Sequence, residues 1–136
     1  MAVNEGARTH GHLEAQIKAW ALASYTYKIC DNKKVFDPQH ESLILRIESL
    51  VTDICLCCWH ANNIRVNKAS DWDERSKLQK KADRLCGDLL CIMQISKPVF
   101  HLRERRIKYW GGMACETQDK IRAWHQGDCK RYGQLN

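Results

Sequence analysis

Apolar residues recur along this chain at alternating spacings of three and four, which is the period of an α-helix with one buried face. The clearest stripe lies between residues 38 and 63. It consists of Ile44, Ile47, Val51, Ile54, Cys58 and Ala61, and is flanked by Leu43, Leu50, Cys57 and Ile64. A face this broad is typical of a helical bundle core rather than of a two-stranded coiled coil.

Three further helices are predicted on the same basis: one over residues 12–30, one from Ser70 to a break at residues 96–98, and one from there to about Gln126. The first stripe consists of Leu13, Ile17, Trp20, Ser24 and Tyr27. The third consists of Leu78, Ala82, Leu85, Leu89 and Ile92, with Cys86, Leu90 and Met93 beside it. The fourth consists of Ile107, Trp110, Ala114, Ile121 and Trp124.

Polar residues, proline and glycine mark the helix ends. Asp37 is a predicted N-cap with Pro38 in the first helical position. An Asn62–Asn63 pair marks the end of that helix, since asparagine tolerates the left-handed geometry of a helix C-terminus. Ser70, with Asp73 three residues later, is the predicted cap of the third helix. Ser96 is the predicted cap of the fourth helix, with Pro98 in its first turn, and Gly127 is its predicted end. The Gly111–Gly112 pair interrupts this helix, and we expect a kink or a close helix contact there.

The 136 residues fit one domain, and the predicted connections are short. Short connections make consecutive helices antiparallel neighbours, so the expected fold is all-α, an up-and-down antiparallel four-helix bundle. The expected organisation is a disordered tip over residues 1–11, the bundle over residues 12–127, and a mobile tail over residues 128–136. The chain contains no apolar run of about 18 residues and no signal-peptide core near Met1, so we expect a cytoplasmic protein.

Eight cysteines lie within the helical patterns, where reduced thiols serve as small apolar side chains. The alternative is a metal site, since Cys55 and Cys58 have CxxC spacing and His60 is near. No second CxxC or HxxxH completes a tetrahedral set, so we expect neither a metal nor another cofactor. The chain also lacks a Walker loop, GxGxxG, HExxH and GxSxG, and its six histidines are scattered singly. We therefore expect no enzymatic activity.

The net charge of +6 resides entirely in the second half of the chain, because residues 68–136 contain 15 basic and 9 acidic side chains. Such an excess indicates an anionic partner, although a solvated helix face is the alternative. The candidate contacts to nucleic acid or to a protein partner are Lys77, Lys80, Lys81 and Arg84, then Arg103, Arg105, Arg106 and Lys108, and finally Arg122, Lys130 and Arg131. They resemble no base-reading motif, so the expected binding is electrostatic and salt-sensitive.

Four tryptophans are considered as stacking platforms for bases: Trp59, Trp72, Trp110 and Trp124. Trp110 and Trp124 lie on the predicted core stripe, which favours burial for both.

Four stretches of the chain resemble a known family of four-helix-bundle proteins: residues 42–48 (SLILRIE), 82–90 (ADRLCGDLL), 95–96 (IS) and 121–124 (IRAW). The family includes the accessory variability determinant of diversity-generating retroelements and, more distantly, proteins encoded by intervening sequences of bacterial 23S ribosomal RNA. The resemblance extends over roughly residues 12–127, and the chain departs from it in its cysteine content and at Trp110–Gly112.

The resemblance implies a homopentamer with no catalytic residues of its own. Such a protein binds the reverse transcriptase of the retroelement and the template-repeat RNA, and supports mutagenic cDNA synthesis and retrohoming. The alternative hypothesis from sequence is an oligomeric helical scaffold that binds other proteins without nucleic acid.

Overall fold

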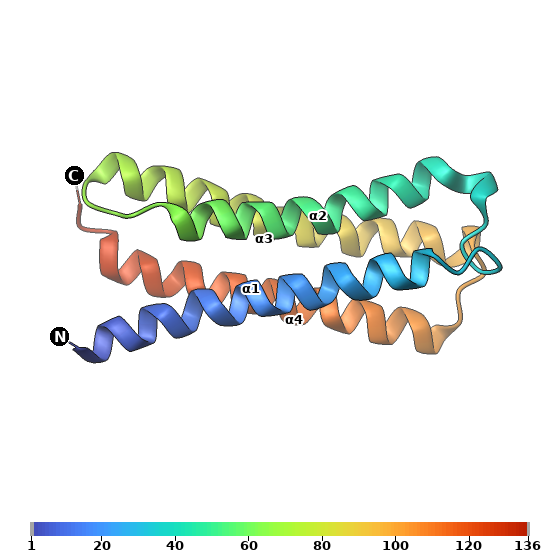
Figure 1. The fold of residues 1–136 in the computed structure, drawn as a ribbon, viewed down its shortest axis with the longest axis horizontal. Helices are drawn as coiled ribbons and strands as arrows, with labels where there is room; N and C mark the ends of the chain where they lie inside the picture. Colours follow the sequence, from blue (N-terminus) through green and yellow to red (C-terminus); the bar gives the residue numbers. More distant parts are fainter. Residues whose placement is uncertain (1, 136) are drawn as a thin grey trace.

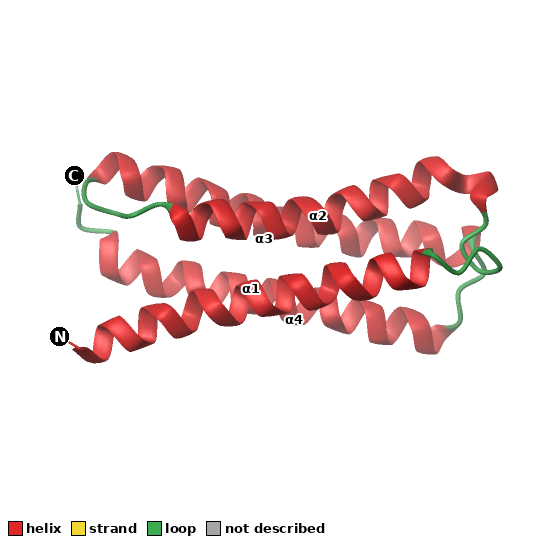
Figure 2. Cartoon of the chain, viewed as in Figure 1, coloured by secondary structure: helices red, strands yellow, loops and turns green. Residues whose placement is uncertain are grey.

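The computed structural model describes residues 2–135, with the side chains of residues 11–135. Its four long helices are α1 (Ala2–Cys30), α2 (Glu41–Asn63), α3 (Ala69–Val99) and α4 (Glu104–Tyr132), and a short 3-10 helix, η1 (Pro38–His40), precedes α2. They run alternately up and down (Figure 1), and residues 2–135 contain helices and loops but no strand (Figure 2). The predicted all-α antiparallel four-helix bundle is confirmed.

Each helix packs against two neighbours: α1 against α2 and α4, and α3 against α2 and α4. The α1–α2 and α3–α4 loops lie together at one end of the bundle, whereas the α2–α3 loop and both chain ends lie at the other (Figure 1). None of the helices in the described part of the chain combines the length and the hydropathy that crossing a bilayer requires.

The predicted core face of α2 is confirmed, because every residue of its main stripe is buried. The start of this segment is also as predicted, since the Asp37 carboxylate accepts a hydrogen bond from the Gln39 N–H at 2.9 Å and Pro38 opens η1. α2 ends at Asn63, but Ile64 continues in an extended conformation, and Asn63 has no positive φ. The end of the helix was therefore predicted correctly, and the left-handed geometry invoked for it was wrong.

The predicted core face of α1 is wrong. Leu13, Ile17, Trp20 and Tyr27 are 42–49 % exposed, and the buried face consists instead of Ala15, Ala19, Leu22, Thr26, Ile29 and Cys30. The reason is the partner helix, because α4 places the whole Trp110 side chain in the core. Thr26 of α1 lies against that indole, and its Oγ1 accepts the Trp110 Nε1–H at 2.9 Å.

The predicted break at residues 96–98 is also wrong, because α3 continues to Val99 with Pro98 inside its last turn. Proline removes a donor and crowds the preceding turn, but these costs are small where the helix ends one residue later. The Ser96 hydroxyl donates to the Ile92 carbonyl at 2.8 Å instead of capping a new helix. At the start of α3, Asp71 rather than Ser70 is the capping side chain, and it accepts the N–H groups of Asn67 and Lys68.

The helices are longer than the sequence predicted. α1 begins at Ala2, so the segment expected as a disordered tip is helical from that residue to Gly11; Met1 lies outside the described residues. α4 continues past Gly127 to Tyr132, because Asp128 is buried in the core, so the expected mobile tail is helical up to that residue. α4 also runs without interruption through Gly111 and Gly112.

Two leucines of α1 test the corrected face. We expect Leu22→Ala to lower the free energy of unfolding by about 2–5 kcal/mol, because it opens a cavity in the core. We expect Leu13→Ala to lower it by less than about 1 kcal/mol, because that side chain is already 43 % exposed. Urea unfolding followed by circular dichroism measures both. Equal losses would contradict the observed rotation of α1.

Candidate functional site

The α1–α2 and α3–α4 loops are fixed by a cluster of aromatic rings. The N–H groups of Val35 and Phe36 both donate to the Asn32 carbonyl, at 3.1 and 2.8 Å. This turn directs Phe36 inward, where its ring centroid lies 4.8 Å from that of Phe100 and 6.2 Å from that of Trp110. The rings close this end of the core and hold the two loops in place.

The α3–α4 loop contains one unusual backbone position. His101 has φ 53°, and it is the one non-glycine residue with positive φ in the part of the chain that the structure describes. Residues other than glycine adopt this conformation at some energetic cost. Its neighbours Phe100 and Leu102 are buried, whereas His101 is exposed. The turn therefore anchors two apolar side chains and leaves the imidazole at the surface.

A cavity of about 830 Å³ lies beside these loops, between the adjoining ends of α1 and α4. Its cationic lining residues are Lys34, Arg103, Arg105 and Arg106; the others are Tyr25, Val35, Phe100, His101, Leu102 and Tyr109. Among the described residues, no aspartate or glutamate lines it. Glu104 is in the same turn, but its carboxylate pairs with Lys97, and that hydrogen bond lowers the pKa of Glu104. The cavity is therefore suited to an anion.

Two tyrosines form an aromatic wall of this cavity. The rings of Tyr25 and Tyr109 lie edge to face, with centroids 5.1 Å apart and planes at 67°. Arg106 Nη1 donates to the Tyr25 hydroxyl at 3.3 Å, which fixes Tyr25 in place. Tyr109 is 60 % exposed, so much of its ring is open to solvent. We call the set Tyr25, Lys34, His101, Arg103, Arg105, Arg106 and Tyr109 the end cavity.

The predicted basic residues do not form one surface. Arg103, Arg105 and Arg106 line the end cavity, and Lys108 is exposed nearby on α4. Lys77, Lys80, Lys81 and Arg84 are exposed on α3. Arg84 lies fifteen residues before the end of α3 at Val99, which is about 22 Å along the helix axis. The α3 group is therefore a second and separate basic surface.

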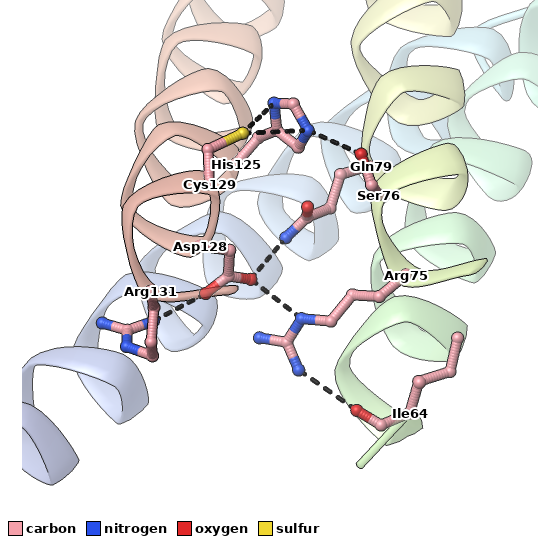
Figure 3. A network of polar contacts seen from close by, with 8 residues as sticks. All are labelled: Ile64, Arg75, Ser76, Gln79, His125, Asp128, Cys129 and Arg131. Atoms are coloured by element: carbon pink, nitrogen blue, oxygen red, sulfur yellow. Dashed lines mark hydrogen bonds and ion pairs between the residues drawn. The ribbon is translucent and has the colours of Figure 1, made fainter. Parts of the chain in front are cut away.

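Two other predicted contact residues are held in ion pairs. Arg122 Nε donates to both carboxylate oxygens of Asp83 at 3.0 Å, which raises the pKa of the arginine. Arg131 donates to Asp128 at 2.6 Å (Figure 3). Lys130 is exposed at the opposite end of the bundle from the cavity. Lys130 and Arg131 are therefore not part of either basic surface, whereas Arg122 is exposed beside Lys80 of the α3 group.

Asp128 is the centre of a buried polar network between α3 and α4 (Figure 3). One of its oxygens accepts hydrogen bonds from Arg75 Nε and Gln79 Nε2, both at 2.8 Å. Arg75 also donates to the Ile64 carbonyl at 3.2 Å, and its guanidinium lies 5.4 Å from the Trp124 ring centroid. A buried carboxylate is tolerated where partners satisfy it in this way. The network fixes the α2–α3 loop against both helices.

A serine, a histidine and a cysteine lie close together beside this network (Figure 3). His125 Nε2 is 2.9 Å from the Ser76 hydroxyl and 3.7 Å from Cys129 Sγ, and its ring stacks on Trp72. Burial, and then the charge of Lys80, lowers the pKa of His125. Ser76 and Trp72 belong to α3, whereas His125 and Cys129 belong to α4, so these contacts pack the two helices together.

None of the tryptophans considered as stacking platforms lines the end cavity. Trp110 and Trp124 are buried in the core, and Trp72 is buried against His125. Trp59 is exposed, but it packs against Trp20 on the α1–α2 side, with ring centroids 6.4 Å apart. Sequence reasoning missed Tyr25, Lys34, His101 and Tyr109. Of these four, only Tyr109 could have been identified from the local sequence, because it directly follows the basic run of residues 103–108.

No protein-family model, curated protein or solved structure matches this chain. Within the described residues, no group of three or more His, Cys, Asp or Glu side chains lies close enough together to hold a metal ion.

Burial makes five of the thiols poor nucleophiles. It raises the pKa of Cys30 and Cys86 to about 12 and that of Cys55 to about 11, and it also raises the pKa of Cys57 and Cys58. Cys91, Cys115 and Cys129 are exposed. The CxxC pair of Cys55 and Cys58 therefore behaves as part of the core.

Thiol titration tests this division. We expect Cys91, Cys115 and Cys129 to react rapidly with a disulfide reagent at pH 8, because thiolate access controls the rate. The other five should react only as fast as the protein unfolds, and rapidly in denaturant. A rapid reaction of Cys58 in the native protein would contradict its assignment to the core.

Proposed function

We propose that this protein is a non-catalytic subunit that binds RNA and accompanies a reverse transcriptase. One observation carries the proposal: three arginines and a lysine surround a cavity with two tyrosines and, among the described residues, no carboxylate. Guanidinium groups donate to phosphate in bidentate geometry, and aromatic rings stack on bases. The exposed Lys77, Lys80, Lys81 and Arg84 on α3 provide a second region for backbone contacts.

The polymerase partner in this proposal comes from the family resemblance. On that reading the chain holds template-repeat RNA for a diversity-generating retroelement, supports mutagenic cDNA synthesis and retrohoming, and assembles as a homopentamer. It performs no bond-making step itself. Its contribution is to bind and position the template.

Charge reversal in the end cavity tests RNA binding. The variant combines Arg103→Glu, Arg105→Glu and Arg106→Glu. We expect at least a tenfold loss of affinity for single-stranded RNA, because a charged hydrogen bond contributes about 1.5 kcal/mol. The wild-type log–log salt slope should be about −0.7 for each phosphate that the protein neutralises. Fluorescence anisotropy measures both quantities, and the slope should become shallower in the variant, in which the α3 contacts remain.

The matched control carries Arg65→Glu, Lys68→Glu and Lys130→Glu. These exposed residues lie at the opposite end of the bundle, and the change in net charge is the same. Equal losses in both triple variants would mean that only net charge matters. A tagged protein purified from its host tests the partner: a reverse transcriptase and one dominant structured RNA should be recovered with it. Recovery of neither from cells that express the element would count against the proposal.

A scaffold is the second candidate function, and the outward side of α1 and α2 favours it. α1 exposes Leu13, Ile17, Trp20, Ser24 and Tyr27, and α2 exposes Leu45, Ser49, Leu56 and Trp59 on a line with half-buried Thr52. The two lines meet where Trp20 packs against Trp59 and where the Tyr27 hydroxyl is 2.9 Å from Thr52 Oγ1. Both have the spacing of a coiled-coil seam. We call this surface the α1–α2 face.

Monomers rarely expose so continuous an apolar surface. A second copy of the chain is the partner that fits it best, because a seam with this spacing on both helices is complementary to itself. Such self-association is compatible with RNA binding, since the end cavity uses other residues.

Sedimentation equilibrium tests the α1–α2 face. We expect the wild-type chain to self-associate and the double variant Leu56→Glu with Trp59→Glu to remain monomeric, because buried carboxylates without partners are strongly unfavourable. Ile95→Glu is the control, since Ile95 is exposed on α3 away from this face. A wild-type chain that stays monomeric at all accessible concentrations would contradict this role.

A further inference from the structure

The cationic side chains of the end cavity fall into two groups with different roles. Arg106 is half-buried and donates to the Tyr25 hydroxyl, so it acts as a positioning residue for the aromatic wall. Arg103, Arg105 and Lys34 are exposed, and no hydrogen bond or ion pair of their side chains occurs among the described residues. These three cations are therefore available to an anionic group beside the wall.

Tyr109 provides an open aromatic surface next to these cations. It is 60 % exposed, although the Tyr25 ring lies against it at 5.1 Å. An edge-to-face contact holds one side of the pair and leaves ring surface for another planar group. The bases of a double helix are stacked on one another and do not reach such a ring, whereas unpaired bases do.

His101 adds an independent observation at the same place. It adopts a positive φ that glycine would adopt without cost, yet the chain has a histidine there, exposed at the cavity. Strained backbone positions concentrate at binding sites. Its imidazole provides a further donor beside Arg103 and Arg105. The volume of about 830 Å³ lies within the range of ligand sites.

We infer that the end cavity holds one unpaired nucleotide of an RNA strand, with its base stacked on Tyr109 and its phosphate bound by Arg103, Arg105 and Lys34. This inference rests on the proposed RNA binding and specifies the ligand. The same chemistry is present in a free mononucleotide, so the source has to be tested. The strand is favoured because the exposed α3 lysines provide further phosphate contacts that a free nucleotide would leave unused.

The test compares three ligands by fluorescence anisotropy. A labelled short single-stranded oligouridine and a labelled RNA duplex of the same length are measured directly, and unlabelled uridine 5′-monophosphate is measured by its competition with the labelled oligouridine. The variants are Tyr109→Ala, Tyr109→Phe and His101→Gly. His60→Ala is the matched control, because His60 is an exposed ring that neither lines the cavity nor belongs to the α1–α2 face. Urea unfolding shows that each variant is folded.

For the single strand, we expect Tyr109→Ala to lower the affinity about tenfold, and Tyr109→Phe and His60→Ala to preserve it. His101→Gly should weaken binding while leaving the midpoint of urea unfolding unchanged or higher, because glycine relieves the backbone strain. The wild-type protein should bind the duplex more weakly than the single strand, and Tyr109→Ala should not change duplex binding.

Unchanged single-strand binding by Tyr109→Ala would overturn the inference, provided that the charge reversals still weaken it; in that case RNA binding stands and only the nucleotide site fails. Duplex binding as tight as single-strand binding would overturn it in the same way. Competition by uridine 5′-monophosphate at concentrations similar to those of the oligouridine would assign the cavity to a free nucleotide and overturn the strand assignment. A wild-type protein that binds none of the three overturns the inference and the proposed RNA binding together.

Discussion

The burial of one tryptophan fixes how the first helix is rotated. Trp110 is fully buried and bonds through its indole N–H to Thr26, which in turn donates to the Leu22 carbonyl at 2.7 Å. With Thr26 directed inward, its two neighbours project to either side, each turned by about 100° around the helix axis. Tyr25 forms the wall of the end cavity, and Tyr27 lies on the α1–α2 face. A single polar contact in the core therefore sets the position of both candidate binding surfaces.

The two ends of the bundle are stabilised by different physical interactions. At the cavity end, Phe36, Phe100 and Trp110 close the core with apolar rings, so the loops can carry cations without burying them. At the opposite end, Asp128 and Arg75 are both buried, and their partners satisfy the charges. A buried ion pair contributes little net stability, but removing one partner costs about 3–5 kcal/mol. That end tolerates fewer substitutions and is less suited to binding a charged ligand.

The sequence predicted most where large apolar residues alone form a face, as in α2, whose stripe is entirely buried. It failed for α1, because alanine and threonine give a weaker periodic signal than the leucine, isoleucine and tryptophan on the exposed side. It misplaced the end of α4, because a buried aspartate looks like a surface residue until Arg75 is known to lie beside it. The arginines of the end cavity were identified from sequence because they cluster within residues 103–106. Tyr25 and Lys34 come from distant segments, so only the fold brings them to the same place.

The cavity opens at the end of the bundle, whereas the α1–α2 face runs along its length. Copies that associated side by side in the same direction would therefore gather their cavities on one rim. A strand held at one cavity would meet the next at a high effective concentration, and avidity would then exceed the affinity of any single site by orders of magnitude. Copies that associated in opposite directions would divide their cavities between two rims and lose this gain. The relative direction of neighbouring chains would thus determine how tightly a long RNA is retained, without any change in the residues that touch it.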